Sequence, residues 1–153
     1  MKVALDFKEL LPTVEEADSV SQCFQCSACV ADCPAARRSA RFNPREIMLK
    51  VLLGLPETLV CENSEVWDCT TCYTCKERCP QGVHPIEVIT ALKNRIAAEG
   101  LLPEKVAAAV EGIKKTDRVI QKSDAISRRR SELGLDFDMD ADGGRIEGVL
   151  DHG

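Results

Sequence analysis

Aromatic side chains and long apolar runs are both scarce in this sequence. Aromatic residues make up 4% of its 153 residues, although hydrophobic residues as a whole make up 44%. The chain is therefore apolar enough to fold, and its length suits one domain with a terminal extension. A core with so few large rings is a modest one, and metal–ligand bonds can take over part of its stabilisation.

No segment has the composition of a membrane span or of a secretory signal. The longest apolar stretch, Ile47 to Leu55, contains Lys50 and Gly54 and stops at Pro56, whereas a membrane helix needs roughly 20 apolar residues. Charges also interrupt the first residues, unlike the start of a signal peptide. We therefore expect a cytoplasmic protein with no membrane span, in a compartment that keeps thiols reduced.

Positive charge is in the minority and is unevenly spread. The chain has 20 Lys and Arg against 25 Asp and Glu, a net charge of −5, which argues against a nucleic-acid partner. Residues 103–133 carry 8 basic and 5 acidic side chains, and residues 134–153 carry 1 and 6. The predicted organisation is a domain over 1–133 and an acidic tail over 134–153, which is disordered or bound to a partner.

Cysteine, in contrast, is abundant, and eight of the nine cysteines form an internal repeat. Its spacing is C-x2-C-x2-C-x3-C-P: Cys23, Cys26, Cys29, Cys33 and Pro34 in the first copy, and Cys69, Cys72, Cys75, Cys79 and Pro80 in the second. This spacing is typical of 4Fe–4S sites, and in two-cluster ferredoxins the fourth cysteine of each motif ligates the other cluster. The repeat therefore indicates metal binding rather than disulfides.

Two 4Fe–4S clusters with crossed ligands are the resulting prediction. Cys23, Cys26, Cys29 and Cys79 are expected to bind one cluster, and Cys69, Cys72, Cys75 and Cys33 the other. Zinc also uses CxxC pairs, but a third cysteine would be surplus in both copies, so zinc is disfavoured. The cations near the motifs either tune the cluster potentials, serve as docking charges for another protein, or are solvated surface charge. They are Arg37, Arg38, Arg41, Arg45, Lys76 and Arg78. Cys61 is interpreted as a small buried hydrophobe, with a redox or ligand role as the alternative.

Helix signals surround the motifs and predict an all-α fold. Helices are expected from Asn43-Pro44 to Gly54, from Pro85 to Gly100, and from Pro103 onwards. The last should be the longest, with a stripe of Val106, Val110, Ile113 and Ile120, until Ser123 or Asp124 breaks or re-caps it. A capping box of Thr13 and Glu16 predicts a further helix towards Cys23. His84 either caps the Pro85 helix, forms a hydrogen bond near a cluster, or is an exposed loop residue.

The paired motifs, the run from Cys79 to Pro85 and the arginine-rich segment after Pro34 resemble HdrC, an iron–sulfur subunit of heterodisulfide reductase. The resemblance covers roughly residues 13–133. It implies an α-helical ferredoxin-like domain with two cubane-cluster loops, an extended C-terminal helix and an acidic tail. The 35-residue gap between Cys33 and Cys69 also favours this fold over a βαββαβ ferredoxin.

The resemblance implies that the chain is an electron-relay subunit of an oxidoreductase complex of methanogenesis, with no catalytic residues of its own. Electrons would pass from a flavin-containing subunit of that complex to a second subunit, which reduces the disulfide of coenzyme M and coenzyme B at special iron–sulfur centres. A hydrogenase or formate dehydrogenase module is a further expected partner. This sequence has neither the adjacent cysteines of the disulfide-reducing subunit nor a glycine-rich dinucleotide fingerprint.

Three alternatives stay open at this point. The chain could be the equivalent relay subunit of a glycolate oxidase, succinate dehydrogenase or sulfate-reducer complex, a free ferredoxin, or a redox sensor. The basic segment and acidic tail favour a permanent subunit over a free carrier. No output module for a sensor is visible in residues 103–153.

Overall fold

The computed structural model describes residues 3–4, 6, 17–120 and 123–135. The chain divides into two compact units, a first unit of residues 1–102 and a second unit of residues 103–153. The described residues form helices and turns, with no strand among them. The all-α prediction is therefore confirmed.

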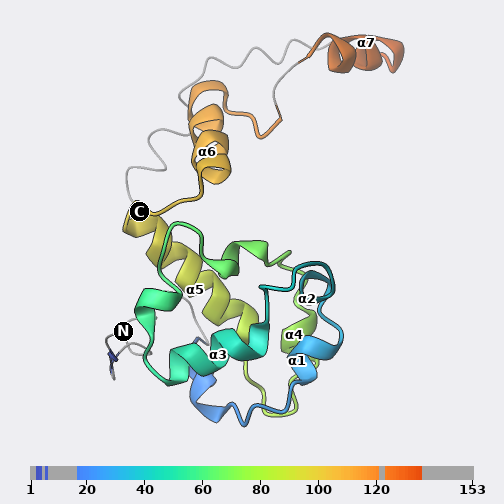
Figure 1. The fold of residues 1–153 in the computed structure, drawn as a ribbon. Coiled ribbons are helices and arrows are strands. Elements are labelled where there is room, and N and C mark those ends of the chain that lie inside the picture. Colours follow the sequence, from blue (N-terminus) through green and yellow to red (C-terminus); the bar gives the residue numbers. More distant parts are fainter. Residues whose placement is uncertain (1–2, 5, 7–16, 121–122, 136–153) are drawn as a thin grey trace. The chain divides into compact units, whose positions relative to one another are not determined.

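The first unit is built from two longer helices and several short ones. These are η2 (Ala17–Gln22), α1 (Ala28–Ala31), α2 (Pro34–Arg38), α3 (Pro44–Leu52), η3 (Pro56–Thr58), η4 (Glu65–Asp68), α4 (Thr74–Glu77) and α5 (Pro85–Ala98), where η marks a 3₁₀ helix. Helix α3 packs against α5, and η2 packs against both. The short helices α1, α2 and α4 gather at one end of the unit (Figure 1).

Local capping explains where α3 begins and ends. The side-chain oxygen of Asn43 accepts hydrogen bonds from the backbone N–H groups of Arg45 and Glu46, and Pro44 occupies the first helical position. Gly54 follows the helix with a φ of +62°, a conformation that suits glycine because it has no Cβ. The predicted helix from Asn43-Pro44 to Gly54 is confirmed.

Helix α5 also follows its prediction, beginning at Pro85 and ending before Gly100, which has a φ of +71°. Its face bearing Ile89, Leu92 and Ile96 is buried. Aliphatic side chains dominate the core against which it packs: Val20, Ile47, Met48, Val51, Leu59, Val66, Val83, Ile89, Leu92 and Ile96. Among the described residues, Phe42 is the one aromatic side chain in the buried set, as the composition predicts.

The second unit contains α6 (Glu104–Thr116) and α7 (Asp124–Glu132). The helix start after Pro103 is confirmed, but two details of the prediction are wrong. Asp117 takes a left-handed φ of +52° and ends α6 at Thr116, so Ile120 lies outside the helix. At 13 residues α6 is also shorter than α5, which has 14.

Helix α7 begins where a new cap was expected. The Oγ atom of Ser123 accepts a hydrogen bond from the backbone N–H of Ile126 at 3.4 Å. The side chain thus satisfies one of the N–H groups that a helix start leaves without a partner. The prediction that Ser123 re-caps the chain is confirmed.

Some predictions concern residues that the structure does not describe. The capping box of Thr13 and Glu16 lies outside the described ranges, and the segment directly after it is the 3₁₀ helix η2. The predicted boundary after residue 133 differs from the division at residue 102, and it stays a prediction because residues 136–153 are also outside those ranges. None of the described helices is long and apolar enough to cross a membrane.

Candidate metal centres

Each copy of the repeat forms a tight loop followed by a one-turn helix. The loop after Cys23 leads into α1, and the loop after Cys69 leads into α4. The same two positions in each loop have positive φ: Gln25 (61°) and Ser27 (69°), Thr71 (54°) and Tyr73 (62°). None of the four is glycine, and the left-handed conformation costs other residues roughly 1–2 kcal/mol. Such turns aim successive backbone N–H groups into a concavity that suits an anionic cluster.

The eight repeat cysteines line two hollows, each formed by both copies. Cys23, Cys26, Cys29 and Cys79 line the first hollow, and Cys33, Cys69, Cys72 and Cys75 line the second. The first hollow holds about 340 Å³ of atom-free space and the second about 310 Å³, counting the part open to solvent. The structure thus brings together the two sets of four that the repeat predicts.

The two hollows are close neighbours. Helix α1, which carries Cys29, packs against α4, which carries Cys75. Cys29 also contributes to the electrostatic environment of Cys75, although the two thiols line different hollows. In the described part of the chain, no three His, Cys, Asp or Glu side chains converge as a single metal ion would need.

The residue after each fourth cysteine redirects the chain. Pro34 begins α2, and Cys33 is its N-cap, with the Sγ atom accepting a hydrogen bond from the backbone N–H of Ala36 at 3.5 Å. This cap holds the buried Cys33 on the side of the second hollow. After Cys79 and Pro80 the chain turns at Gly82, whose φ is +64°, before α5 begins.

One cysteine of each hollow is exposed. The second cysteine of each motif, Cys26 or Cys72, is exposed, whereas Cys33 and Cys75 are buried and the other four are intermediate. An exposed aromatic side chain lines each hollow as well: Phe24, 58% exposed, in the first, and Tyr73, 46% exposed, in the second. Each hollow therefore has one thiol at the surface, and the two buried thiols both line the second hollow.

Burial makes three of the thiols, Cys29, Cys69 and Cys75, resist ionisation. Burial, and then the charge of Cys23, raises the pKa of Cys29 to about 11. Burial and then Cys69 raise the pKa of Cys75 to about 12, and burial raises that of Cys69. Thiolates are the form that binds iron, so four thiolates around one hollow would need the positive charge of iron to neutralise them. This donor chemistry fits an iron–sulfur cluster.

Cys72 departs from this trend. Its pKa is lowered, chiefly by a hydrogen bond with the hydroxyl of Thr74 and also by the backbone N–H of that residue. The Sγ atom of Cys72 lies 3.5 Å from Oγ1 of Thr74. The sequence alone did not single out Thr74, because its position in the first copy of the repeat is an alanine, Ala28.

Most of the predicted cations near the motifs are engaged in ion pairs. Arg41 donates two hydrogen bonds of 2.8 Å to the carboxylate of Asp68, and a third, of 3.1 Å, to the carbonyl of Asn63. Ser39 donates to the same carboxylate at 2.7 Å. These contacts, with the Arg41 hydrogen bond first, lower the pKa of Asp68. Arg41 thus joins the segment after the first motif to the residue that precedes Cys69.

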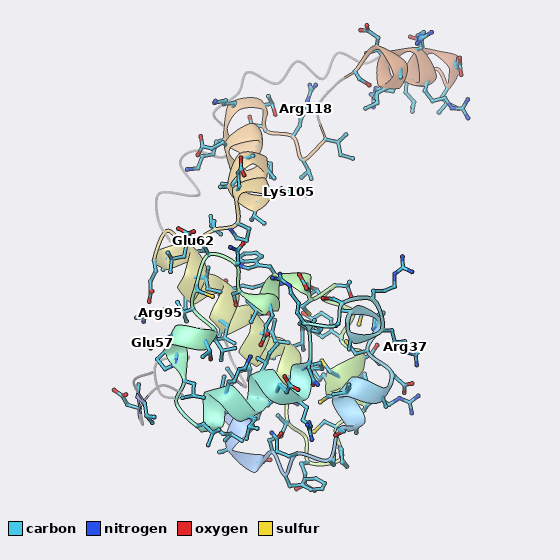
Figure 2. The ribbon with its side chains drawn as sticks, in the orientation of Figure 1. Arg37, Glu57, Glu62, Arg95, Lys105 and Arg118 are labelled. Carbon is cyan, nitrogen blue, oxygen red and sulfur yellow. The ribbon has the colours of Figure 1, made fainter. Side chains whose placement is uncertain are left out.

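The other predicted cations differ in their surroundings. Arg37 pairs with Asp32 at 3.4 Å and lies at the opposite end of the first unit from Glu57 and Arg95 (Figure 2). Lys76 pairs with Glu87 at 3.5 Å. Arg38 is exposed, and Arg45 lines the first hollow. Of the six cations, Arg45 is thus the one that lines a hollow.

Lys93 of α5 is a site residue that sequence reasoning missed. Its Nζ atom donates to the carbonyl of Cys69 at 3.3 Å and lies 5.4 Å from the centre of the Trp67 ring, within the range of a cation–π contact. Its charge favours the thiolate form of Cys69. A lysine this far along the chain from the motif gives no local signal of the contact.

Two further residues depart from the predicted roles. Cys61 is half-buried rather than fully buried. His84 occupies the N-cap position of α5 without a side-chain capping bond, and its backbone N–H donates to Oγ of Ser19 at 3.0 Å. Neither Cys61 nor His84 lines a hollow.

Comparison with known proteins identifies the cofactors of this chain. A family model described as a 4Fe-4S dicluster domain matches residues 19–83, a range that contains both copies of the repeat. The iron-sulfur subunit designated C in the CoB--CoM heterodisulfide reductase of Methanopyrus kandleri is 38% identical over 122 residues, which are 80% of this chain and 62% of the relative. The subunit designated C2 in the H(2)/formate:CoB-CoM heterodisulfide,ferredoxin reductase of Methanococcus maripaludis is 34% identical, over 82% of this chain and 66% of that protein.

A third relative is covered more fully. The corresponding subunit of the ferredoxin/F(420)H(2)-dependent CoB-CoM heterodisulfide reductase of Methanosarcina acetivorans is 30% identical over 84% of this chain and 79% of its own length. This chain belongs to the HdrC family of heterodisulfide reductase subunits. The dicluster match gives its cofactors as two 4Fe–4S clusters, which decides against zinc. The chain spans 62% of the Methanopyrus kandleri relative.

Proposed function

We propose that this chain relays electrons, one at a time, through two 4Fe–4S clusters inside a heterodisulfide reductase complex. The observation that carries the proposal is the grouping of eight cysteines into two adjoining hollows within one compact unit. When bound, each cluster supplies a centre that accepts and releases a single electron. Electrons enter from the flavin-containing subunit of the complex and leave to its disulfide-reducing subunit.

The ligand sets are part of this proposal. Cys23, Cys26, Cys29 and Cys79 hold one cluster, and Cys33, Cys69, Cys72 and Cys75 hold the other. The lining of the two hollows and the packing of α1 against α4 support this crossed arrangement. Because each cluster then takes ligands from both copies, the two loops are tied together and electrons have a short path between them.

The chain's other residues hold the thiols and limit the access of water. Met48 and Val83 line the first hollow, and Phe42, Ile86 and Ile89 line the second. This apolar lining leaves the exposed Cys26 and Cys72 as the points nearest to solvent. We assign one of these two sulfurs to the side on which electrons enter and the other to the side on which they leave.

The names of the relatives support the choice of complex. They differ in the electron donor, which is H(2) or formate in one and ferredoxin or F(420)H(2) in another, and they share the CoB-CoM heterodisulfide. Because the acceptor is shared, we assign HdrC the same role in each complex, which is to deliver electrons to the disulfide-reducing subunit. We place this complex in the cytoplasm. A hydrogenase or formate dehydrogenase module then supplies electrons upstream of the flavin-containing subunit.

Affinity purification of the tagged chain from its native host tests the choice of complex. The expected partners are a flavin-binding chain and a chain with adjacent-cysteine repeats. The purified chain should contain about eight irons and a matching amount of sulfide. Recovery of a glycolate oxidase or succinate dehydrogenase chain would overturn the assignment, and stable isolation of the chain alone at high salt would favour a free carrier.

Electron relay itself is tested inside the purified complex. Replacing Cys29 with Ser should abolish reduction of the heterodisulfide by the native donor. Reduction of the disulfide-reducing subunit by a small artificial donor should stay intact. Cys61→Ser is the matched control, because Cys61 lines neither hollow. Native electron transfer that survives the loss of a cluster would contradict a relay through both.

The acidic segment 134–153 belongs to the proposal as a docking element for a neighbouring subunit. Its composition, 6 acidic side chains against 1 basic, leaves little apolar surface with which to fold alone. Deletion of residues 134–153 should weaken assembly of the complex without changing its iron content. Unchanged assembly and electron transfer would refute this role.

A further inference from the structure

The two copies of the repeat differ around their exposed cysteine. In the second copy a threonine lies on each side of Cys72 at a spacing of two residues, Thr70 and Thr74. In the first copy the same positions around Cys26 hold Phe24 and Ala28. One exposed sulfur therefore has hydroxyl neighbours and the other has none at these positions.

Thr74 is held where its hydroxyl can reach the sulfur. It is the first residue of α4, directly after Tyr73, whose φ of 62° sets the direction of the helix. Its side chain is half-buried, lines the second hollow, and has Oγ1 3.5 Å from Sγ of Cys72. Because threonine is branched at Cβ, its side chain has few rotamers and the hydroxyl is held in place.

A hydrogen bond of this kind favours the more negative state of the sulfur. In the thiol form, Sγ of Cys72 donates this bond to Oγ1 of Thr74 at 3.5 Å. A thiolate has no proton to donate, so the Thr74 hydroxyl is the donor when the sulfur binds a cluster. A thiolate bound to a cluster keeps part of this negative charge. Reduction adds one more negative charge to the cluster, and hydrogen bonds to the sulfurs are among the factors that set iron–sulfur potentials.

The first hollow has its own polar contact, at a different sulfur. Nε2 of Gln25 lies 3.3 Å from Sγ of Cys23 and can donate to it. The corresponding residue of the second copy is Thr71, whose backbone contributes to Cys69. Of the two exposed cysteines, Cys72 is thus the one with a threonine hydroxyl two residues away on each side.

We infer that Thr74 is a potential-tuning residue, which raises the reduction potential of the second cluster through its hydrogen bond to the sulfur of Cys72. The inference rests on the ligand sets proposed above. One electron enters the cluster from the donor and one leaves to the next acceptor. The Thr74 hydroxyl keeps its proton throughout, so the tuning does not depend on proton transfer.

Redox titration of the full-length, cluster-loaded protein, followed by EPR, tests the inference. Thr74→Val keeps the branched shape and removes the hydroxyl, and it should shift one of the two midpoint potentials to a lower value. Thr74→Ser should restore the midpoint towards that of the unaltered protein. Thr58→Ala is the control, since the Thr58 hydroxyl bonds to the carbonyl of Leu55 and lines neither hollow.

A gain-of-function variant makes the test independent of how well Thr74→Val holds its cluster. Ala28→Thr places a hydroxyl at the equivalent position of the first copy and should raise the other midpoint. Unchanged midpoints in both variants, with iron and sulfide content intact, would overturn the inference. Under the proposed ligand sets, Cys33→Ser loses the second cluster and keeps the first. If Thr74→Val shifts the midpoint potential of the cluster that Cys33→Ser keeps, the ligand sets are wrong. Failure of the inference can therefore be distinguished from failure of the proposed ligand sets.

Discussion

The carboxylate of Asp32 and the guanidinium of Arg78 form an ion pair, with Oδ2 and Nε 3.0 Å apart. The two residues occupy the same position in the two copies of the repeat, immediately before Cys33 and Cys79. Cys33 lines the second hollow with three cysteines of the second copy, and Cys79 lines the first hollow with three cysteines of the first copy. The ion pair therefore joins the two copies at the point where their cysteines cross.

Reversing one charge of this pair should speed cluster loss. Reversing both should restore part of the lost cluster stability, because Asp32 also pairs with Arg37 and that second contact is not restored. Asp32 and Arg78 are 42% and 63% exposed, so the expected coupling is only about 0.2–1 kcal/mol. The measurement is the decay of cluster absorbance in denaturant for Asp32→Arg, Arg78→Asp and the double variant. Glu132→Arg, which breaks the exposed Arg129 pair of α7, is the control. If the effects of the two single variants on the decay rate simply add in the double variant, the ion pair contributes nothing to cluster stability.

Substituting Gly54 by alanine should be more damaging than the same change at Gly100. Both glycines have positive φ, 62° and 71°, and therefore share the conformational cost of a side chain there. A Cβ at Gly54 would also lie 2.1 Å from the carbonyl oxygen of Ala4, whereas at Gly100 it would meet nothing within 4 Å. Alanine at Gly54 also threatens the 2.8 Å hydrogen bond from the N–H of Ala4 to the Gly54 carbonyl.

Thermal unfolding of the two glycine variants, under matched conditions, checks this difference. Gly100→Ala is expected to cost about 1 kcal/mol from its backbone conformation alone. Gly54→Ala should cost clearly more, because either the chain near Ala4 or the end of α3 must shift. Equal losses would mean that the contact between Ala4 and Gly54 does not matter for stability.

The left-handed residues of the motif loops should be sensitive to branching at Cβ. Ser27, with a φ of 69°, should tolerate glycine, which adopts this conformation without strain. Ser27→Val should lower stability and slow cluster assembly, because branching at Cβ adds to the cost that serine already bears in this conformation. The rate and yield of cluster reconstitution measure both variants. Assembly of Ser27→Val at the rate of Ser27→Gly would show that the loop conformation is not needed for assembly.

Much of the first unit could be predicted because its signals are local. Asn43, Pro44 and Gly54 act within one turn of α3, so capping chemistry places that helix. The repeat likewise predicts which cysteines come together, because its spacing limits how a short chain can surround a cluster. Pro85 and Gly100 delimit α5 in the same way.

What could not be predicted depends on contacts between distant residues or on conformations that several residue types share. The contacts of Arg41 with Asp68 and of Lys93 with Cys69 form because separate segments pack together. No spacing in the sequence predicts such contacts. The apolar stripe of α6 continues on paper to Ile120, but Asp117 adopts a left-handed conformation and ends the helix. Aspartate can adopt this conformation and end a helix, but it does so too rarely for the sequence alone to predict that α6 ends at this position.

The crossed assignment of the two clusters is tested most directly by comparing three single variants. EPR spectra and midpoint potentials are recorded for the reduced forms of Cys79→Ser, Cys29→Ser and Cys75→Ser. The crossed arrangement predicts that Cys79→Ser perturbs the same cluster as Cys29→Ser and leaves the cluster perturbed by Cys75→Ser intact. A Cys79→Ser protein that matches Cys75→Ser instead would show that each motif holds its own cluster, and would contradict the account.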